Sequence, residues 1–216
     1  MPGEVFSYNK IIGDTTAAKG YLPASTFKGG TIVQEMGGGI CQTVSTLYDV
    51  ALRSNLQITE RHQHGLPVGY VKPSLDATVY GDVLDLKFKN TRAYPIKIVT
   101  SFSPSGSMNI SLYGTKEANE YDIELTSKYL YTIPYTTQYI YDNTMLSGQQ
   151  VVISNGANGY ASEGYITKKL GGKIISSTLL SKDIYKAQQR VVKVGTKANE
   201  QVQTPPPDNT GEVGIY

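Results

Sequence analysis

The strongest periodic pattern along the chain predicts one amphipathic helix near its start. Apolar side chains recur at the spacing of a single helical face, at Val44, Leu47, Tyr48, Ala51 and Leu52. Three glycines at positions 37–39 precede this stripe, and glycine can adopt positive φ and approach a ligand closely. We therefore predict a helix over Cys41–Arg53 that starts from a flexible glycine loop.

Beyond the helix, apolar and polar positions alternate with the period of strands. Turn-forming residues at 90–92 and 103–106 separate the alternating runs. A helix followed by a meander of strands predicts an α+β domain, with one main helix packed on antiparallel strands. The predicted strands are residues 56–59, 82–89, 96–100 and 108–112.

Residues 122–197 form a second region, in which glycines punctuate short alternating runs. This pattern predicts an elongated all-β module with a small core. The polar segment 114–120 separates the two regions, so we expect domains at 1–117 and 122–197. Residues 198–216 contain three consecutive prolines and few apolar side chains, which predicts a disordered tail. Strands of the module are expected at 135–140, 151–154, 164–168, 173–178 and 187–194.

Charge and composition narrow the function classes. The formal net charge is +2 and the Lys and Arg residues are scattered, so no nucleic-acid partner is predicted. The 17 tyrosines, against four phenylalanines and no tryptophan, suit half-exposed sheet faces and contact with a polymer such as carbohydrate. A single cysteine excludes an internal disulfide. With only two histidines beside it, the chain also cannot build a zinc site from four cysteines, or from two cysteines and two histidines. We predict no bound metal and no cofactor.

The sequence shows no signal peptide or membrane span. The N-terminus lacks an apolar h-region, and no run of 18 apolar residues occurs. The chain begins abruptly, in sequence of structured character. We therefore expect a signal or anchor to lie upstream in a longer protein, and any membrane contact to run through it.

Cys41 is the candidate nucleophile, because it directly follows the glycine loop and opens the predicted helix. Unpaired N–H groups and the dipole at a helix N-terminus favour a thiolate, the reactive form of cysteine. Backbone N–H groups of Gly38, Gly39 and Cys41 could also stabilise an oxyanion. The side chain of Gln42 could donate to that oxyanion or to a substrate carbonyl. The alternatives are a structural cysteine packed at a helix start and a capping role for Gln42.

A base and an orienting group lie downstream of the thiol. His62 and His64 are two residues apart, and either could deprotonate it. Each could equally be a hydrogen-bonded surface side chain, and the pair could bind a metal with a carboxylate. Asp76 could orient the histidine or simply cap a turn. Arg61 could hold a substrate carboxylate or form a surface ion pair.

The order of several motifs resembles a known family. PGEVFSYNKIIG, GYLPA, GGGICQTVSTLYDVAL, ERHQHGLPVGYV, SLDATVYGDVLDLKFKN and ISLYG follow one another as in the VanW-like domain of bacterial surface proteins. This resemblance covers about residues 2–115. Gly65 stands where the family commonly has Ser, and Ser74 where it commonly has Gly. The stretches TIPYTTQYIYDNTMLSGQQVVISNGANGY and QRVVKVGTK are similar to the cell-wall module called the G-five domain, over about residues 122–197.

The resemblance implies an extracellular or cell-wall protein of a Gram-positive bacterium, with peptidoglycan stem peptides and glycan strands as partners. It implies cysteine L,D-transpeptidase activity, with a thioester acyl-enzyme, release of D-Ala and a 3-3 cross-link. Cys41 would be the nucleophile and His64, ahead of His62, the base. The alternatives are a non-catalytic wall-binding scaffold and a different thiol acyl-transferase or peptidase. The β module would act as a targeting stalk, so its deletion should spare activity on soluble substrates.

Overall fold

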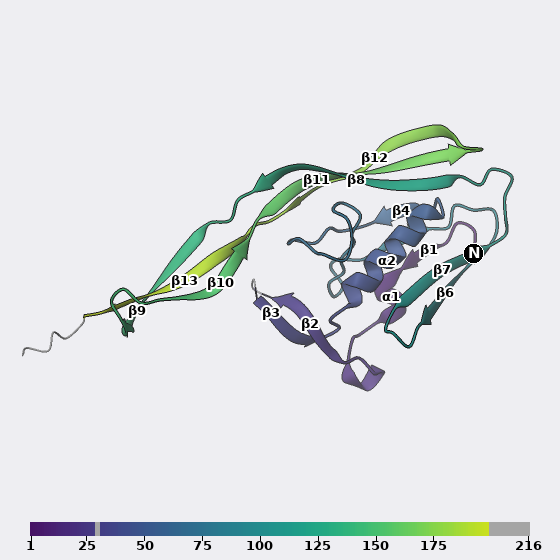
Figure 1. Cartoon of the computed structure of the whole chain (residues 1–216). Coiled ribbons are helices and arrows are strands. Elements are labelled where there is room, and N and C mark those ends of the chain that lie inside the picture. Colours follow the sequence, from purple (N-terminus) through teal and green to yellow (C-terminus); the bar gives the residue numbers. More distant parts are fainter. Residues whose placement is uncertain (29–30, 199–216) are drawn as a thin grey trace, which may run out of the picture. The chain divides into compact units, whose positions relative to one another are not determined.

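The computed structural model describes residues 1–28 and 31–198, which form two compact units (Figure 1). The first unit joins Met1–Thr136 to Gly156–Gln189, and the second joins Thr137–Asn155 to the residues from Arg190 onward. Most of the regular structure is β with few helices, which is compatible with the predicted α+β class. The predicted disordered tail lies outside the described residues, except for Ala198.

The first unit contains a three-stranded antiparallel sheet. Its strand order is β1 (Val5–Ser7), β5 (Lys87–Lys89) and β4 (Gln57–Glu60). The strand predicted over 82–89 is therefore wrong in its first half. There the chain turns back, because Tyr80 and Leu84 bond to each other's backbone in an isolated bridge.

Two hairpins and two short helical turns complete the N-terminal region. The hairpin of β6 (Ile96–Phe102) and β7 (Met108–Gly114) forms where two strands were predicted. The remaining elements were not predicted from the sequence. They are α1 (Tyr8–Ile12), a 3-10 turn (Ala17–Lys19) and the hairpin of β2 (Pro23–Lys28) and β3 (Thr31–Met36).

Helix α2 (Ile40–Arg53) begins one residue before the predicted start. Its N-cap, Gly39, has φ 87°, a conformation that disfavours any residue with a Cβ. Gly38 is required for a different reason, because a Cβ there would lie 2.4 Å from the carbonyl carbon of Ala24. The buried face of the helix contacts β4, β7 and β8. It comprises Val44, Ser45, Leu47, Tyr48, Ala51 and Leu52, the apolar stripe predicted from the sequence plus one serine.

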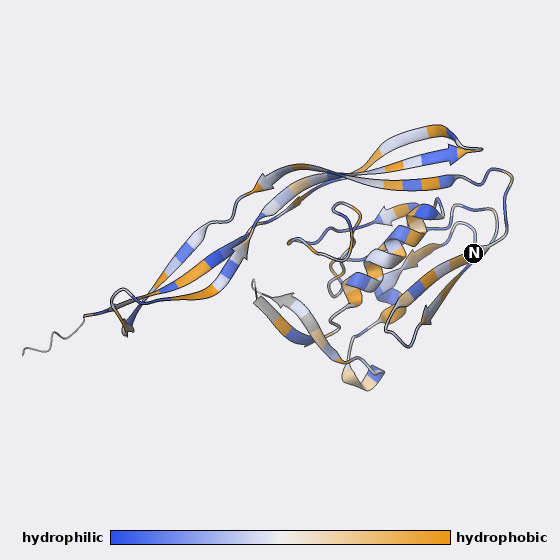
Figure 2. Ribbon diagram, in the orientation of Figure 1, coloured by the Kyte–Doolittle hydropathy of each residue, from blue (hydrophilic) through white to orange (hydrophobic). Residues whose placement is uncertain are grey.

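A second antiparallel sheet belongs to the same unit as the helix. Its order is β12 (Lys173–Tyr185), β11 (Gly159–Leu170) and β8 (Asp122–Ile133), and hydrophobic residues alternate with hydrophilic ones at the start of β8 (Figure 2). Ile123 and Leu125 of β8 join the same core cluster as α2. Strands β8, β11 and β12 of the predicted β module thus belong to the same compact unit as the N-terminal region.

The second unit is built around a separate three-stranded sheet. Its order is β10 (Gln150–Ala157), β13 (Gln188–Lys197) and β9 (Thr137–Leu146), and β13 runs parallel to β9. Val192 is buried, while most side chains of β9 and β10 are exposed. The small core matches the expectation for a glycine-punctuated module. Within the described part of the chain, no helix has the length and hydrophobicity needed to cross a bilayer.

Gly164 of β11 provides a test of the packing inside the first unit. A Cβ at this position would lie 2.5 Å from the carbonyl oxygen of Ser74, which is backbone and cannot move aside cheaply. We expect Gly164→Ala to lower the free energy of unfolding by about 1–3 kcal/mol, measured by urea denaturation. Gly69→Ala is the matched control, because a Cβ there meets nothing within 4 Å. Equal effects of the two substitutions would contradict the packing described.

Candidate active site

Cys41 is the second residue of α2, and its thiol faces the segment that follows Asp76. Its Sγ lies 3.2 Å from Thr78 Oγ1 and 3.8 Å from the carbonyl oxygen of Val79. One helical turn later, the Ser45 hydroxyl accepts a hydrogen bond from the Ala77 N–H at 3.0 Å. The helix therefore holds this segment against the thiol through side-chain and backbone bonds together.

The imidazole of His64 lies between Asp76 and Cys41. Its Nδ1 is 2.6 Å from Asp76 Oδ2, and the backbone N–H of His64 donates to the same oxygen at 2.8 Å. Its Nε2 lies 3.0 Å from the hydroxyl of Tyr70. Cys41 and His64 also lie close enough for each side chain to shift the pKa of the other. A thiol, an imidazole and a carboxylate thus follow one another in space, in the order that nucleophilic catalysis requires.

The electrostatics of the pair favour a thiolate beside an imidazolium. Burial raises the pKa of the Cys41 thiol, but hydrogen bonds to His64 and Thr78 lower it more, and the net pKa lies below its ordinary value. Burial lowers the pKa of His64, but hydrogen bonds to Asp76 and Cys41 raise it more, to about 9. Both shifts increase the fraction of the ion pair at neutral pH.

Arg61 does not face a substrate, contrary to the role predicted for it. Its Nε donates to the backbone carbonyl of Asp76 at 2.7 Å and its Nη2 to Asp76 Oδ1 at 2.8 Å. Its Nη1 lies 2.9 Å from each carboxylate oxygen of Asp183. The side chain is only 9% exposed, so this is a buried ion pair and not the surface pair considered as the alternative.

His62 is also directed away from the thiol. Its Nε2 lies 3.1 Å from Glu60 Oε1, and the side chain is 37% exposed. His62 sits in a backbone bridge with Thr78, while His64 lies in the loop beyond. The structure therefore brings His64, and not His62, to Cys41.

The N–H groups predicted to stabilise an oxyanion differ in whether they already have a hydrogen-bond acceptor. The Gly38 N–H donates to the carbonyl of Glu35 at 3.3 Å, and the backbone N–H of Gln42 donates to that of Gly39 at 3.1 Å. The N–H groups of Gly39 and Cys41 lie at the start of α2, where a helix has no acceptor of its own to offer. They are therefore the better candidates. The side chain of Gln42 is exposed and lines a groove of about 420 Å³ between α2 and the β6–β7 hairpin.

Sequence reasoning missed the side chains that surround Asp76 and His64. Tyr185 of β12 donates a hydrogen bond to Asp76 Oδ1, and its ring is buried. Tyr70 follows His64 by six residues in an irregular loop, where no periodicity marks it. Asp183 stands between Lys182 and Ile184, outside the strands predicted from the sequence, and no local pattern marks its partner.

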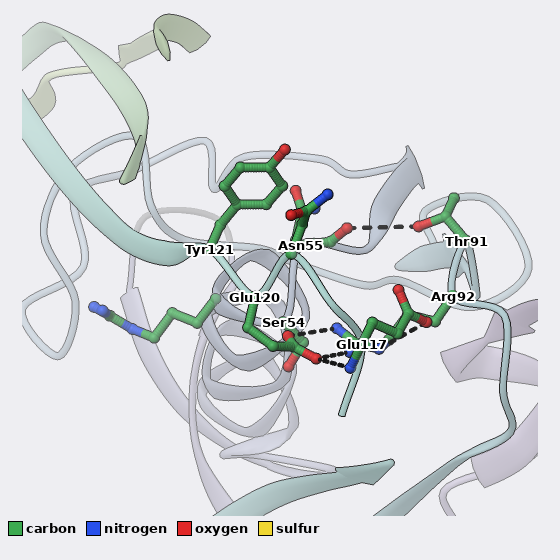
Figure 3. A pocket seen from close by; sticks show the side chains of 9 residues that line it. Ser54, Asn55, Thr91, Arg92, Glu117, Glu120 and Tyr121 are labelled. Atoms are coloured by element: carbon green, nitrogen blue, oxygen red, sulfur yellow. Dashed lines mark hydrogen bonds and ion pairs between the residues drawn. The ribbon is translucent and has the colours of Figure 1, made fainter. Parts of the chain in front are cut away.

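A pocket at the C-terminal end of α2 lies at the opposite end of the helix from Cys41 (Figure 3). Its volume is about 70 Å³, and ion pairs from Arg92 to Glu117 and Glu120 cross it. Cys41, His64 and Asp76 do not line it. Across residues 1–28 and 31–198, no three His, Cys, Asp or Glu side chains gather in a way that could hold a metal ion.

The two histidines can be separated by the reactivity of the thiol. Because the thiol pKa lies below its ordinary value, we expect iodoacetamide to alkylate Cys41 rapidly at about pH 6–7, with the rate falling as acid protonates the thiolate. His64→Ala should raise the thiol pKa by at least about one unit and slow this reaction about tenfold or more. His62→Ala should leave the rate within about twofold. A loss in His62→Ala alone would reverse the assignment.

Arg61 can be tested through stability. Arg61→Met would leave two carboxylates buried without their cation, and we expect it to lower the free energy of unfolding by about 3–5 kcal/mol. Arg53→Met is the control, because Arg53 pairs with Asp49 at 2.7 Å on the surface and is 52% exposed. That substitution should cost less than about 1 kcal/mol. Urea denaturation of both variants measures the difference, and similar values would contradict the buried role.

Comparison with known proteins gives two family matches and several relatives. A family model described as VanW like protein matches residues 1–113, and a G5 domain model matches residues 125–197. The protein YoaR of Bacillus subtilis (strain 168) is 40% identical over 119 residues, which are 55% of this chain and 39% of YoaR. Vancomycin B-type resistance protein VanW of Enterococcus faecalis (strain ATCC 700802 / V583) is 30% identical over 94 residues, 41% of this chain and 34% of that protein.

Solved structures of G5 domains are similar to part of this chain. The HP0197-G5 crystal structure covers 34% of this chain and 97% of its own, at 20% identity and a TM-score of 0.22. The IgA1 protease G5 domain covers 37% and 96%, at 17% identity and a TM-score of 0.26. This chain also spans less than two-fifths of the length of YoaR or VanW. The family match nevertheless covers just over half of the chain, and the chain belongs to the VanW-like family, with a G5 domain following the VanW-like domain.

Proposed function

We propose that this chain is a cysteine L,D-transpeptidase that acts on peptidoglycan stem peptides. The observation that carries the proposal is that Cys41, His64 and Asp76 lie together, with His64 bonded to Asp76 and the thiol at a helix N-terminus. The VanW-like and G5 matches support a cell-wall-associated protein at the cell surface, where such a substrate occurs. The remaining steps follow from the chemistry of these groups.

Acylation begins from the thiolate and the imidazolium. The Cys41 Sγ attacks the carbonyl carbon of the L-residue that precedes a terminal D-Ala, and the N–H groups of Gly39 and Cys41 stabilise the resulting oxyanion. The carbon–nitrogen bond then breaks. His64 gives its Nε2 proton to the leaving nitrogen, so that D-Ala departs with a neutral amine and a thioester remains.

Deacylation reverses the proton transfer. Neutral His64 accepts a proton from the amine of a neighbouring stem peptide as that nitrogen attacks the thioester carbonyl. The carbon–sulfur bond breaks, the thiolate and imidazolium are restored, and the two stems are joined by a 3-3 amide link. If water attacks in place of the amine, the product is a shortened stem with a free carboxylate. Asp76 keeps the imidazole in the tautomer that presents Nε2 to these groups.

A non-catalytic wall-binding function is the second candidate, and one feature of the β module favours it. Tyrosines lie exposed along β8 and β9, at Tyr129, Tyr131, Tyr139 and Tyr141. Exposed aromatic rings suit contact with a sugar polymer. This function would require no reactive thiol, so the state of Cys41 separates the two candidates.

The decisive experiment uses disaccharide-tetrapeptide muropeptides as substrate. We expect the chain to release D-Ala and form 3-3 linked dimers, with a transient acyl adduct on Cys41 in intact-protein mass spectra. Cys41→Ala should abolish all three, and His64→Ala should reduce turnover at least about 100-fold, within the range for loss of a general acid–base group. His62→Ala is the matched control and should retain activity.

Other results would assign a different function. Release of D-Ala without dimers, still dependent on Cys41, would indicate a thiol carboxypeptidase. The absence of both turnover and adduct, in protein shown by circular dichroism to be folded, would favour the wall-binding scaffold.

A further inference from the structure

The end of β12 runs alongside the segment that carries His64. Three of the four contacts follow the chain order of both segments, and the fourth reaches Asp76. Consecutive contacts of this kind hold a loop in one conformation, because each bond restrains a different residue of it. They are Asp183 to Arg61 at 2.9 Å, Gln63 Nε2 to Ile184 O at 2.7 Å, Tyr185 to Asp76, and Lys186 N–H to Gly65 O at 2.8 Å.

The Tyr185 hydroxyl links the carboxylate of Asp76 to the turn before it. It donates to Asp76 Oδ1 and accepts from the Ser74 N–H at 2.8 Å. Its ring is 1% exposed and packs against Tyr160, with centroids 4.9 Å apart. The hydroxyl therefore cannot turn to solvent, and Oδ1 is held while Oδ2 remains directed at His64.

Asp183 shares the positive charge of Arg61 with Asp76. The Arg61 guanidinium lies between two carboxylates, with Nη1 on Asp183 and Nη2 on Asp76 Oδ1. Without Asp183, Arg61 would have Asp76 as its one remaining carboxylate partner. The guanidinium would then compete with the imidazole of His64 for that carboxylate. Asp183 is 6% exposed and also accepts from the Ser181 hydroxyl at 3.1 Å, so its own position is fixed by β12.

The groups that set the charge of the Cys41–His64 pair thus come from several elements. The titratable and charged side chains facing Asp76 and His64 are Cys41 and Tyr48 of α2, Arg61 and Tyr70 from the segments around His64, Tyr160 of β11, and Asp183 and Tyr185 of β12. Only the β11 and β12 residues lie in the part of the chain that the G5 domain model matches.

We propose that Tyr185 and Asp183 are positioning residues for Cys41 and His64, so that the G5-matched module completes the active site of the VanW-like domain. The proposal rests on the proposed function and gives the module a part in it beyond attachment. This role differs from the targeting stalk expected from the sequence.

The test measures the ionisation of the thiol in the full chain. The rate of alkylation of Cys41 by iodoacetamide is followed from pH 4 to 10 in the wild type, Tyr185→Phe and Asp183→Asn. We expect each substitution to raise the apparent thiol pKa by about one unit, which slows alkylation about tenfold at acidic pH. Tyr165→Phe is the matched control. It removes a tyrosine hydroxyl bond of 2.7 Å to Glu163 on the same sheet and should leave the profile unchanged.

The outcomes separate positioning from mere stability. An unchanged profile in folded Tyr185→Phe and Asp183→Asn would overturn the proposal, whatever their melting temperatures. If Tyr185→Phe does not fold, Asp183→Asn decides, since it preserves side-chain volume, and Asp183→Glu should restore part of the wild-type profile. Alkylation needs no muropeptide. A wild type without turnover would therefore overturn the proposed function, while the profile still decides the role of the two residues.

Discussion

The carboxylate of Asp76 is a charge removed almost entirely from water, with 1% of its side chain exposed. Such burial costs several kcal/mol unless every oxygen finds a partner. Here Oδ1 accepts from Arg61 and Tyr185, and Oδ2 accepts twice from His64. Burial raises the pKa of Asp76, but the bonds from His64 and Tyr185 and the charge of Arg61 lower it more. The side chains that keep Asp76 ionised are thus the ones that locate the base.

The position of the thiol depends on the same constraint. The segment from Asp76 to Val79 is fixed at one end by the carboxylate and along its length by Ser45 of α2. Because Thr78 and Val79 contact Cys41, an error in the placement of Asp76 would reach the nucleophile as well as the base. The glycine loop adds the last requirement, since Gly38 allows α2 to start directly against Ala24.

Local sequence patterns predicted much of this region, and their failures have physical reasons. The apolar stripe located α2, and the glycine loop with its cysteine and downstream His and Asp brought attention to three residues that do lie together. The sequence left the roles of Arg61 and His62 open, because packing and not sequence spacing determines their partners, Asp183 and Glu60. Tyr185 is one of 17 tyrosines. Its acceptor, Asp76, lies 109 positions earlier in the chain, so no local pattern links the two residues. Of the strand expected over 82–89, only Lys87–Lys89 forms. The Asp85 side chain before it accepts hydrogen bonds from Ser7 and Asn9, distant partners that a local pattern does not show.

Ser74 shows how closely the β11–β12 hairpin is joined to the segment that precedes Asp76. Its φ of 61° is a backbone conformation that glycine adopts more readily, and its side chain is fully buried. Its N–H, hydroxyl and carbonyl each bond to a residue of the β11–β12 hairpin, namely Tyr185, Ser162 and Ser181. Recombination that exchanged this hairpin for an unrelated module would leave three polar groups in the interior without these partners. In this chain the hairpin is therefore part of the interior around Ser74, and an unrelated module could not replace it without a loss of stability.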